Sequence, residues 1–443
     1  MKAITQAFQA HELPYDFVGE AARRIVRGHS WESLHTTEYI ISGNLEQLPT
    51  VEGYHLQEEP AYLKGFSRAS YTREDHLEWC YITLLPPGLP KEEALKKCLA
   101  ERGFSIEAFV VSPQGERIDP FGVLDDVEQN ILRFLKKPGY ALNTSPRHLI
   151  GASRLIAECQ VQYSDGHLQQ IHELADRVLF CSRAFWFQEL TMLLCGEYAS
   201  QGLQALFDTR VLGLLLPEAH GMVDFAKSSL YHHKDLWKHT LQVVDQAERT
   251  PLVRWAALLH DAGKLWTRTY GPEKSVHFFR HDELGAILAE GICKRLRCRQ
   301  DFEEALIFLI RHHQRPNTYD SDWSDSAVRR LMRECGVYLR SLLALSKADM
   351  TSKIPEKRER AAQRSAELER RITEISQKDR ERQFLPKGLV TEVMKAFDLK
   401  PGPILKQLQE QLKRDIQEGK LEAHQQIAYY ITYLQQHPGY LSN

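Results

Sequence analysis

The sequence lacks several features that would place the chain in a membrane, in an oxidising compartment or on nucleic acid through charge alone. None of its eight cysteines forms a CxxC pair, which excludes a zinc ribbon, and their scatter is typical of buried thiols in a reducing compartment. There is no apolar run of about 18 residues and no apolar stretch of signal-peptide type near residue 1. The net charge of −2 gives no global positive field. We therefore expect a cytoplasmic protein with no membrane partner.

The periodicity predicts a mixed fold with a small α/β part followed by an all-α body. Residues 81–85 and 105–112 are rich in β-branched and apolar residues and predict strands, with a helix over 92–103 between them. Residues 119–126 predict a turn that leads into a helix beginning at Val127. From about residue 140 onward the pattern is helical, including segments 145–160, 182–198 and 203–216. Residues 356–382 are highly charged and predict a long solvated helix.

Histidine and aspartate recur where apolar helices are predicted to begin or end. The chain has 19 histidines, and the residues in question come from five segments: His239, His260 with Asp261, His281, His312 with His313, and Asp349. If these segments pack as a bundle, their imidazoles and carboxylates form a nitrogen and oxygen ligand set between helices. Such a set suits Mn, Mg, Fe, Ni or Zn. In contrast, we interpret His232, His233 and His277 as ordinary surface or structural histidines.

A divalent ion at this cluster would make phosphate hydrolysis possible. A bound metal lowers the pKa of coordinated water from about 15.7 toward about 7, which provides a nucleophile at neutral pH. The adjacent pair His260 and Asp261 is the strongest element of the cluster, because both side chains flank one helix end. Lys264, one turn further on, could hold a phosphate oxygen as a point charge.

These segments resemble the HD superfamily of metal-dependent phosphohydrolases. They are most similar to the HD domain of bacterial tRNA nucleotidyltransferases, the CCA-adding enzymes and poly(A) polymerases. The matching stretches are KDLWKHTLQVVDQ, VRWAALLHDAGKLWTRT, VHFFRHDELGA, RHHQRP, WSDSAVRRLMRECG and KADMTSK, in family order between residues 234 and 353. The resemblance implies metal ligands at His239, His260, Asp261 and Asp349. It adds His281 and His313 as ligands of a second metal or of phosphate, with His313 preferred over His312 because Gln314-Arg315-Pro316 follows it.

The resemblance also implies four parts. These are a nucleotidyltransferase-like α/β domain over residues 1–140, a helical neck over 141–225, the HD domain over 226–355 and a helical tail over 356–443.

The first of these parts resembles the family's transferase domain but lacks its chemical residues. Residues 18–28 read VGEAARRIVRG where the family has VGGxVRDxLLG, so Glu20 replaces a glycine and Arg24 replaces an aspartate. That loop needs glycine so that the backbone can approach a triphosphate. The family's D-x-D pair, which holds two magnesium ions, aligns with Thr37 and Tyr39, and Glu38 is expected on the opposite face of the strand.

Further family positions of the transferase are also changed. Gly103 stands at the aspartate of the R-R-D-F-T motif, His148 and Gly151 stand where arginine is usual, and Ala184 and Phe185 occupy polar positions of the nucleotide-selecting helix, while Arg154 is retained. We therefore predict a retained fold with an inactive transferase site. The alternative is a misalignment, with a true carboxylate pair elsewhere.

The leading hypothesis is a phosphohydrolase that uses one or two divalent ions and Asp261, Lys264, His281 and His313 as catalytic residues. The resemblance implies phosphomonoesters, nucleotides or 2′,3′-cyclic phosphates as substrates, including phosphorylated small molecules and RNA 3′ ends such as that of tRNA. Arg315, Arg329 and Arg330 could contact phosphates, although a solvated helix face explains such arginines equally well. The alternatives are an active tRNA nucleotidyltransferase and a non-catalytic RNA-binding protein. The metal and the oligomeric state stay open.

Overall fold

The computed structural model describes residues 2–441 apart from 33–35, 60–65, 74–77, 165, 224, 226–234, 273–274, 352–353 and 424. His232 and His233 therefore lie outside the described residues. The chain forms two compact units, one of residues 1–316 with 340–354 and the other of residues 317–339 with 355–443. The division into four parts stays a prediction.

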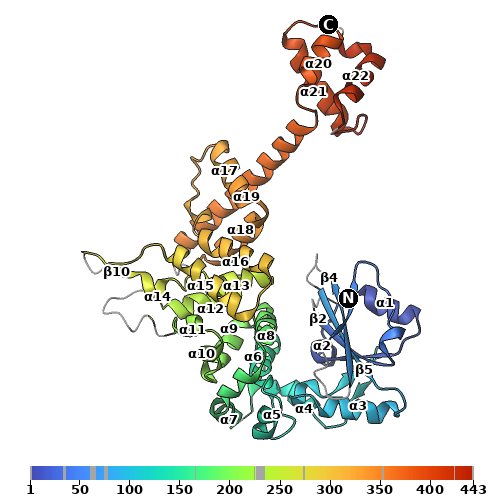
Figure 1. Ribbon diagram of the computed structural model, residues 1–443, viewed down its shortest axis with the longest axis vertical. Helices are drawn as coiled ribbons and strands as arrows, with labels where there is room; N and C mark the ends of the chain where they lie inside the picture. Colours follow the sequence, from blue (N-terminus) through green and yellow to red (C-terminus); the bar gives the residue numbers. More distant parts are fainter. Residues whose placement is uncertain are drawn as a thin grey trace. The chain divides into compact units, whose positions relative to one another are not determined.

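The N-terminal part of the first unit is a mixed sheet with helices on both faces (Figure 1). Its strand order is β3-β4-β5-β2-β1-β6-β7, and only the β2–β5 pair is parallel among these described strands. The elements are α1 (Lys2–Ala10), β1 (Tyr15–Val18), α2 (Gly19–Val26), β2 (Thr36–Ser42), β3 (His55–Glu59), β4 (Ser67–Arg73), β5 (Glu78–Leu85), α3 (Lys91–Ala100), β6 (Val110–Val111) and β7 (Arg117–Ile118).

Strand alternation divides the side chains of this sheet between two apolar layers. On one face, Phe8 of α1 packs against the rings of Tyr15, Tyr39 and Tyr71 at centroid distances of 5.5, 5.5 and 6.3 Å. The other face forms a buried cluster with α3 that includes Val18, Ile40, Leu85, Leu95 and Leu99. Because alternate residues of β2 face opposite layers, Thr37 and Tyr39 lie on one face while Glu38 and Ile40 lie on the other.

The predicted strand at 81–85 and the helix over 92–103 are confirmed in type, but two neighbouring predictions were wrong. Only Val110–Val111 of segment 105–112 is a strand, because Ser105–Glu107 forms a 3-10 turn whose first amide donates to the Arg133 carbonyl. The helix predicted to begin at Val127 is α4 (Leu124–Gln129). It ends where Asn130 adopts φ 59°, and β8 (Ile131–Leu132) follows.

The helical body begins with elements that connect the sheet to the histidine-bearing helices. They are α5 (Pro138–Thr144), α6 (His148–Cys159), β9 (Gln162–Tyr163), α7 (His167–Glu173), α8 (Arg183–Cys195), α9 (Ala199–Asp208), α10 (Val211–Leu215) and α11 (Pro217–His220). The short strand β9 pairs with β8 in parallel. The segment 203–216 is two helices rather than one, because Arg210 takes a left-handed conformation with φ 64° between α9 and α10.

The helices that carry or flank the predicted ligands complete the first unit. They are α12 (Leu236–Gln246), α13 (Pro251–Leu259), α14 (Lys264–Thr267), α15 (His281–Leu296), α16 (Gln300–His312) and α18 (Leu339–Ala348), with a hairpin of β10 (Arg268–Tyr270) and β11 (Val276–Phe278) between α14 and α15. A capping side chain and a proline fix the starts of two of these helices. Asp235 caps α12 by accepting from the Lys238 amide, and Pro251 occupies the first turn of α13.

The second unit contains α17 (Asp325–Cys335), α19 (Pro355–Gln383), α20 (Leu389–Ala396), α21 (Pro403–Gln417) and α22 (Ile427–Gln436). The long charged helix predicted over 356–382 is confirmed as α19. Arg329 of α17 pairs with Asp379 of α19, with Nε 2.8 Å from Oδ2. The last three helices enclose a core of their own that includes Leu389, Leu412 and Tyr430. Among the described residues, no helix is long and apolar enough to cross a membrane.

Gly263 permits the closest backbone approach beside the histidine cluster. It lies between Asp261 and α14, and a Cβ added there would lie 2.0 Å from the His281 carbonyl oxygen and 2.8 Å from the Gly285 amide nitrogen. Both atoms belong to the backbone of α15, so neither can move aside cheaply. Glycine at this position therefore brings the chain after Asp261 into contact with the start of α15.

We predict that Gly263→Ala lowers the free energy of unfolding by at least about 1–3 kcal/mol, because the new methyl group overpacks two helix backbones. Gly291→Ala on α15, the helix that Gly263 contacts, is the control, since its Cβ would meet nothing within 4 Å. That change should stabilise by roughly 0.5–1 kcal/mol. Urea unfolding followed by circular dichroism measures both. Equal stabilities for the two variants would contradict the close approach.

Candidate metal centre

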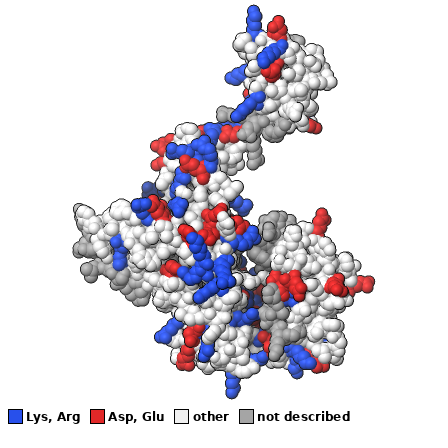
Figure 2. Space-filling model, in the orientation of Figure 1, with Lys and Arg blue, Asp and Glu red and all other residues white. Residues whose placement is uncertain are grey.

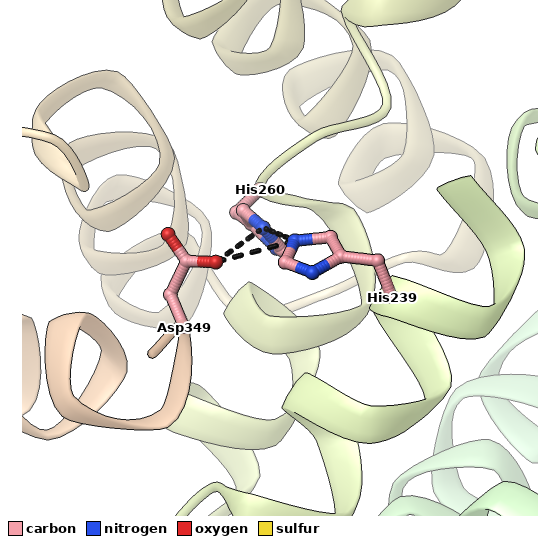
Figure 3. Close-up of side chains that lie close together, drawn as sticks. All are labelled: His239, His260 and Asp349. Carbon is pink, nitrogen blue, oxygen red and sulfur yellow. Dashed lines mark hydrogen bonds and ion pairs between the residues drawn. The ribbon is translucent and has the colours of Figure 1, made fainter. Parts of the chain in front are cut away.

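The structure brings the six predicted ligands together in the first unit. They fall into two groups that could each hold an ion, one of His239, His260 and Asp349 and the other of Asp261, His281 and His313. In each group, one ligand atom per residue lies within 4.8 Å of the others. Figure 3 shows the first group, in which the two imidazoles and the carboxylate of Asp349 point toward one another.

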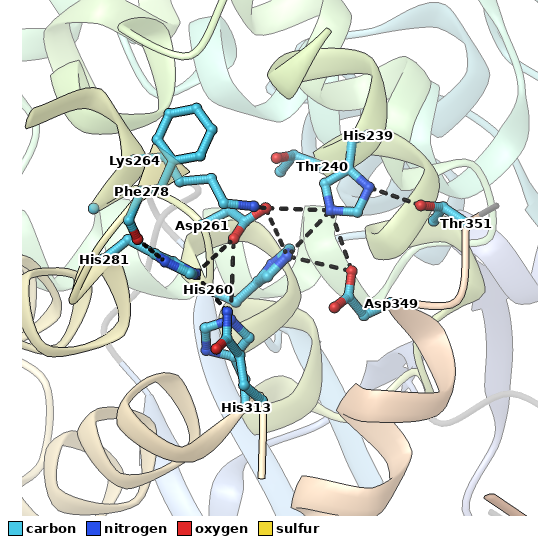
Figure 4. Close-up of polar contacts among 12 residues, drawn as sticks. His239, Thr240, His260, Asp261, Lys264, Phe278, His281, His313, Asp349 and Thr351 are labelled. Atoms are coloured by element: carbon cyan, nitrogen blue, oxygen red, sulfur yellow. Dashed lines mark hydrogen bonds and ion pairs between the residues drawn. The ribbon is translucent and has the colours of Figure 1, made fainter. Parts of the chain in front are cut away.

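Asp261 connects the two groups, because each of its carboxylate oxygens faces a different one (Figure 4). Oδ2 lies 3.3 Å from Nε2 of His239 and 3.4 Å from Nε2 of His260. Oδ1 lies 3.4 Å from Nε2 of His281 and 4.0 Å from Nε2 of His313. Asp349 closes the first group, with Oδ1 3.2 Å from Nε2 of His239. This arrangement matches a carboxylate that could bridge two ions.

All four imidazoles are oriented by a hydrogen bond at Nδ1. The rings of His260, His281 and His313 donate to the carbonyl oxygens of Ala257, Phe278 and Ile310 over 2.9, 2.9 and 2.7 Å. Nδ1 of His239 lies 2.9 Å from the Thr351 hydroxyl oxygen. A ring that donates through Nδ1 presents an unprotonated Nε2 when neutral, which is the form that ligates a metal. The four Nε2 atoms therefore face inward as a donor set.

Burial and the neighbouring charges shift the pKa values of this cluster in opposite directions. Burial alone would lower the pKa of His260, but Asp261 and Asp349 beside it raise that pKa to about 10. Burial and the neighbouring His260 lower the pKa of His313 to about 4. Although burial opposes ionisation of Asp261, His260 and Lys264 hold its pKa well below the usual range. The carboxylates are therefore ionised and ready to bind a cation.

The remaining predicted residues have different surroundings. Nζ of Lys264 lies 2.6 Å from Oδ2 of Asp261, so this lysine neutralises the shared carboxylate. Arg315 is half-buried in the first unit, while in the second unit Arg329 is paired with Asp379 and Arg330 is exposed. His312 packs on Phe308 rather than in the cluster, and exposed His277 contacts Ser275. The preference for His313 over His312 agrees with this geometry.

Two residues beside the cluster were missed by the sequence reasoning. Thr351 orients His239, and Gln314 donates through Nε2 to Nε2 of His281 over 3.1 Å. Thr351 follows Asp349 by two residues, and Gln314 directly follows His313. Their proximity to predicted ligands was the available signal, but only the fold shows that Thr351 reaches a histidine 112 residues away.

The region of the predicted transferase loop is occupied by internal ion pairs. The Glu20 carboxylate accepts from Arg23 over 3.1 Å, from Arg24 over 3.0 Å and from the Cys159 thiol over 3.2 Å. Arg23 is 2% exposed and also lies 3.7 Å from Glu158. Glu20, Glu158 and Cys159 lie close enough to hold an ion, but the two carboxylates are already paired with arginine. Arg23 contacts both of them, Arg24 contacts Glu20 and Arg154 contacts Glu158.

Thr37 and Tyr39, which align with the family's carboxylate pair, lie in apolar surroundings. Thr37 and Tyr39 are at most 1% exposed, and Tyr39 packs edge-on against Phe8 under α1. Glu38 lies on the opposite face, as expected, where the guanidinium of Arg102 donates to both of its oxygens over 2.8 and 2.9 Å. A single carboxylate that is already paired with arginine does not form a two-magnesium site.

Two other changed transferase positions contact each other. A Cβ on Gly103 would lie 2.5 Å from the ring of His148, so glycine at this position leaves room for that imidazole. Burial and the neighbouring Arg147 lower the pKa of His148 to about 4, which keeps the ring neutral. The retained Arg154 donates to Glu158 over 2.7 Å and to Glu189 over 3.0 Å, so its charge is compensated within the protein.

Comparison with known proteins agrees with this geometry. Residues 236–368 match the family model of the HD domain, and residues 166–222 match the model described as the probable RNA and SrmB-binding site of polymerase A. A crystal structure of the Bacillus stearothermophilus CCA-adding enzyme in complex with CTP superposes with a TM-score of 0.50 at 15% identity, covering 98% of this chain and 96% of that one. The chain carries an HD domain on the fold of a CCA-adding enzyme. The predicted fold class and the stated resemblance are thereby confirmed.

Curated relatives in sequence belong to the same group of enzymes. The multifunctional CCA protein of Stenotrophomonas maltophilia strain K279a is 27% identical over 267 residues, which is 58% of this chain and 63% of the relative. The A-adding tRNA nucleotidyltransferase of Deinococcus radiodurans is 27% identical over 276 residues, which is 60% of this chain and 61% of the relative. The chain therefore spans less than two thirds of the length of these relatives.

We predict that Thr351→Val weakens metal binding to the HD domain by about 10- to 100-fold, because His239 loses the partner that fixes its ring. Isothermal titration with Mn²⁺ or Ni²⁺ measures the affinity, and circular dichroism checks the fold. Thr373→Val on α19 is an isosteric control, since that hydroxyl donates to the Glu369 carbonyl of its own helix, away from the predicted ligands. Unchanged affinity in Thr351→Val would contradict the orienting role.

Proposed function

We propose that the HD domain is a metal-dependent phosphohydrolase with ligands His239, His260, Asp349, Asp261, His281 and His313. The observation that carries the proposal is the shared carboxylate of Asp261, whose two oxygens face two separate groups of inward-pointing nitrogens. A donor set of imidazoles and carboxylates suits Mn, Ni, Mg, Fe or Zn, and two adjoining groups favour two ions over one. When bound, a divalent ion acidifies coordinated water and polarises a phosphate.

The residues of the chain would orient the ligands and bind the substrate. The carbonyls of Ala257, Phe278 and Ile310 and the Thr351 hydroxyl hold the imidazoles in ligating orientation. Lys264, whose side chain is 24% exposed, is the partly exposed cation beside the cluster. Its ammonium would move from Asp261 to a phosphate oxygen of the substrate. Gln314 adds an amide that can donate to the substrate next to His281.

Replacement of Asp261 by alanine should abolish phosphatase activity and reduce metal binding with little loss of folded structure, because the carboxylate serves both groups. Activity toward bis-p-nitrophenyl phosphate after loading with Mn, Ni or Mg, together with calorimetric metal titration, measures both effects. Asp301→Asn is the control, since that carboxylate lies in an exposed pair with Arg299. If metal-loaded wild-type protein hydrolyses neither this ester nor cyclic nucleotides, the proposal is wrong and the non-catalytic alternative is favoured.

Nucleotidyl transfer is the second candidate, because relatives in sequence are named multifunctional CCA protein and A-adding tRNA nucleotidyltransferase. We infer that this activity is lost, since Thr37 and Tyr39 provide no carboxylates and Glu20 is engaged by Arg23 and Arg24. The RNA 3′ end, including that of tRNA, stays a proposed substrate of the HD domain, and a cytoplasmic location is proposed with it.

Incubation with labelled CTP or ATP, Mg²⁺ and tRNA that lacks its terminal nucleotides should yield no extended product. The reason is the missing pair of magnesium-binding carboxylates on β2. A CCA-adding enzyme in the same buffer serves as the positive control for the tRNA preparation. Extension of the tRNA by this chain would show that a functional carboxylate pair exists elsewhere.

A further inference from the structure

The β10–β11 hairpin connects directly to the metal ligands. Its last residue, Phe278, accepts the Nδ1 hydrogen bond of His281, and its ring lies 5.7 Å from Nζ of Lys264 (Figure 4). That same ammonium contacts Asp261. In Figure 1 the hairpin projects from the helices beside α14. The hairpin thus begins at the proposed phosphate site and extends away from it.

One face of the hairpin alternates cationic and aromatic side chains. Arg268 lies opposite Phe278 in the antiparallel register, and Tyr270 lies opposite Val276, so Arg268, Tyr270 and Phe278 share a face. The guanidinium carbon of Arg268 lies 4.4 Å from the ring centre of Phe225 and 5.8 Å from that of Tyr270. From the metal ligands outward, the order is Lys264, Phe278, Arg268 and Tyr270.

This face ends in an exposed ring. Tyr270 is 53% exposed, whereas Phe225 is 8% exposed and supports Arg268 from below. Exposed aromatic rings and guanidinium planes are the surfaces on which nucleobases stack, and interleaved lysine and arginine bind the phosphates between them. The alternation of charge and ring therefore complements a single strand of nucleic acid.

We propose that Lys264, Phe278, Arg268 and Tyr270 bind the last nucleotides of a single-stranded RNA whose terminal phosphate lies at the HD metal centre. The proposal rests on the proposed hydrolase function and specifies its substrate as an oligonucleotide. Along β10, Tyr270 lies two residues beyond Arg268 and therefore farther from Phe278, whose ring the Lys264 ammonium contacts. Tyr270 therefore stacks on a base upstream of the terminal nucleotide.

The opposite face of the hairpin provides a matched control. His277 pairs with Thr269 in the register and therefore points away from Arg268 and Phe278. It stacks on Phe279 with centroids 5.4 Å apart and an interplanar angle of 13°, and Phe279 is 68% exposed. Phe279 is thus an exposed aromatic residue of similar size close to Tyr270 in the chain, on the other side.

The binding test uses the full chain and a fluorescein-labelled trinucleotide with a 3′-phosphate, in EDTA so that no turnover occurs. Fluorescence anisotropy should show a Kd that is roughly 5- to 100-fold higher for Tyr270→Ala, the range expected for one lost base stack. Tyr270→Phe and Phe279→Ala should bind like the wild type. An unchanged Kd in Tyr270→Ala, or an equal loss in Phe279→Ala, overturns the proposal.

The activity test separates this inference from the proposed function. With Mn²⁺ present, the ratio of kcat/KM for a cyclic-phosphate-ended trinucleotide to that for bis-p-nitrophenyl phosphate should fall roughly 5- to 100-fold in Tyr270→Ala. In Phe279→Ala the ratio should stay constant. Equal losses on both substrates overturn the stacking role. If wild-type protein hydrolyses neither substrate, the proposed function fails. The binding test in EDTA still decides whether Tyr270 contributes to RNA binding.

Discussion

The contacts of the buried Asp261 carboxylate are the constraint on which the geometry of the candidate metal centre depends. This carboxylate is 2% exposed and surrounded by four imidazoles and one ammonium, so its charge is compensated by neighbouring groups rather than by solvent. Each imidazole is in turn held by a carbonyl or a hydroxyl from its own or a neighbouring segment. Residues in or next to α12, α13, α15, α16 and α18 therefore contribute to one set of nitrogen and oxygen atoms.

The sequence predicted that these residues lie close together, as the structure places them, because they stand at helix ends. His260, Asp261, His313 and Asp349 follow the last turns of apolar helices, and His281 begins one, so a bundle brings them together whatever its detailed angles. The sequence could not show that Asp261 serves two groups, since this depends on the direction of each carboxylate oxygen. It also could not show Thr351 beside His239, because that contact depends on how α18 is placed against α12.

The errors in secondary structure share one physical cause. Segments 105–112, 127–135 and 203–216 all carry apolar residues at suitable spacing, yet each is interrupted by a single local conformation. Asn130 and Arg210 adopt left-handed φ values without being glycine, and the Ser105 amide is taken by a carbonyl from another segment. Periodicity measures which face is buried and does not report a local change of backbone conformation, so the pattern alone extends the elements too far.

The transferase-like region and the HD domain arrange their buried charged groups in different ways. In and beside the transferase-like region, Arg23, Arg102 and Arg154 each pair with at least one carboxylate of the chain itself. In the HD domain the inward-facing atoms are imidazole nitrogens and carboxylate oxygens, with Lys264 as the nearest ammonium. The first region thus directs its buried charges into internal ion pairs, whereas the second directs a set of ligand atoms toward a common centre.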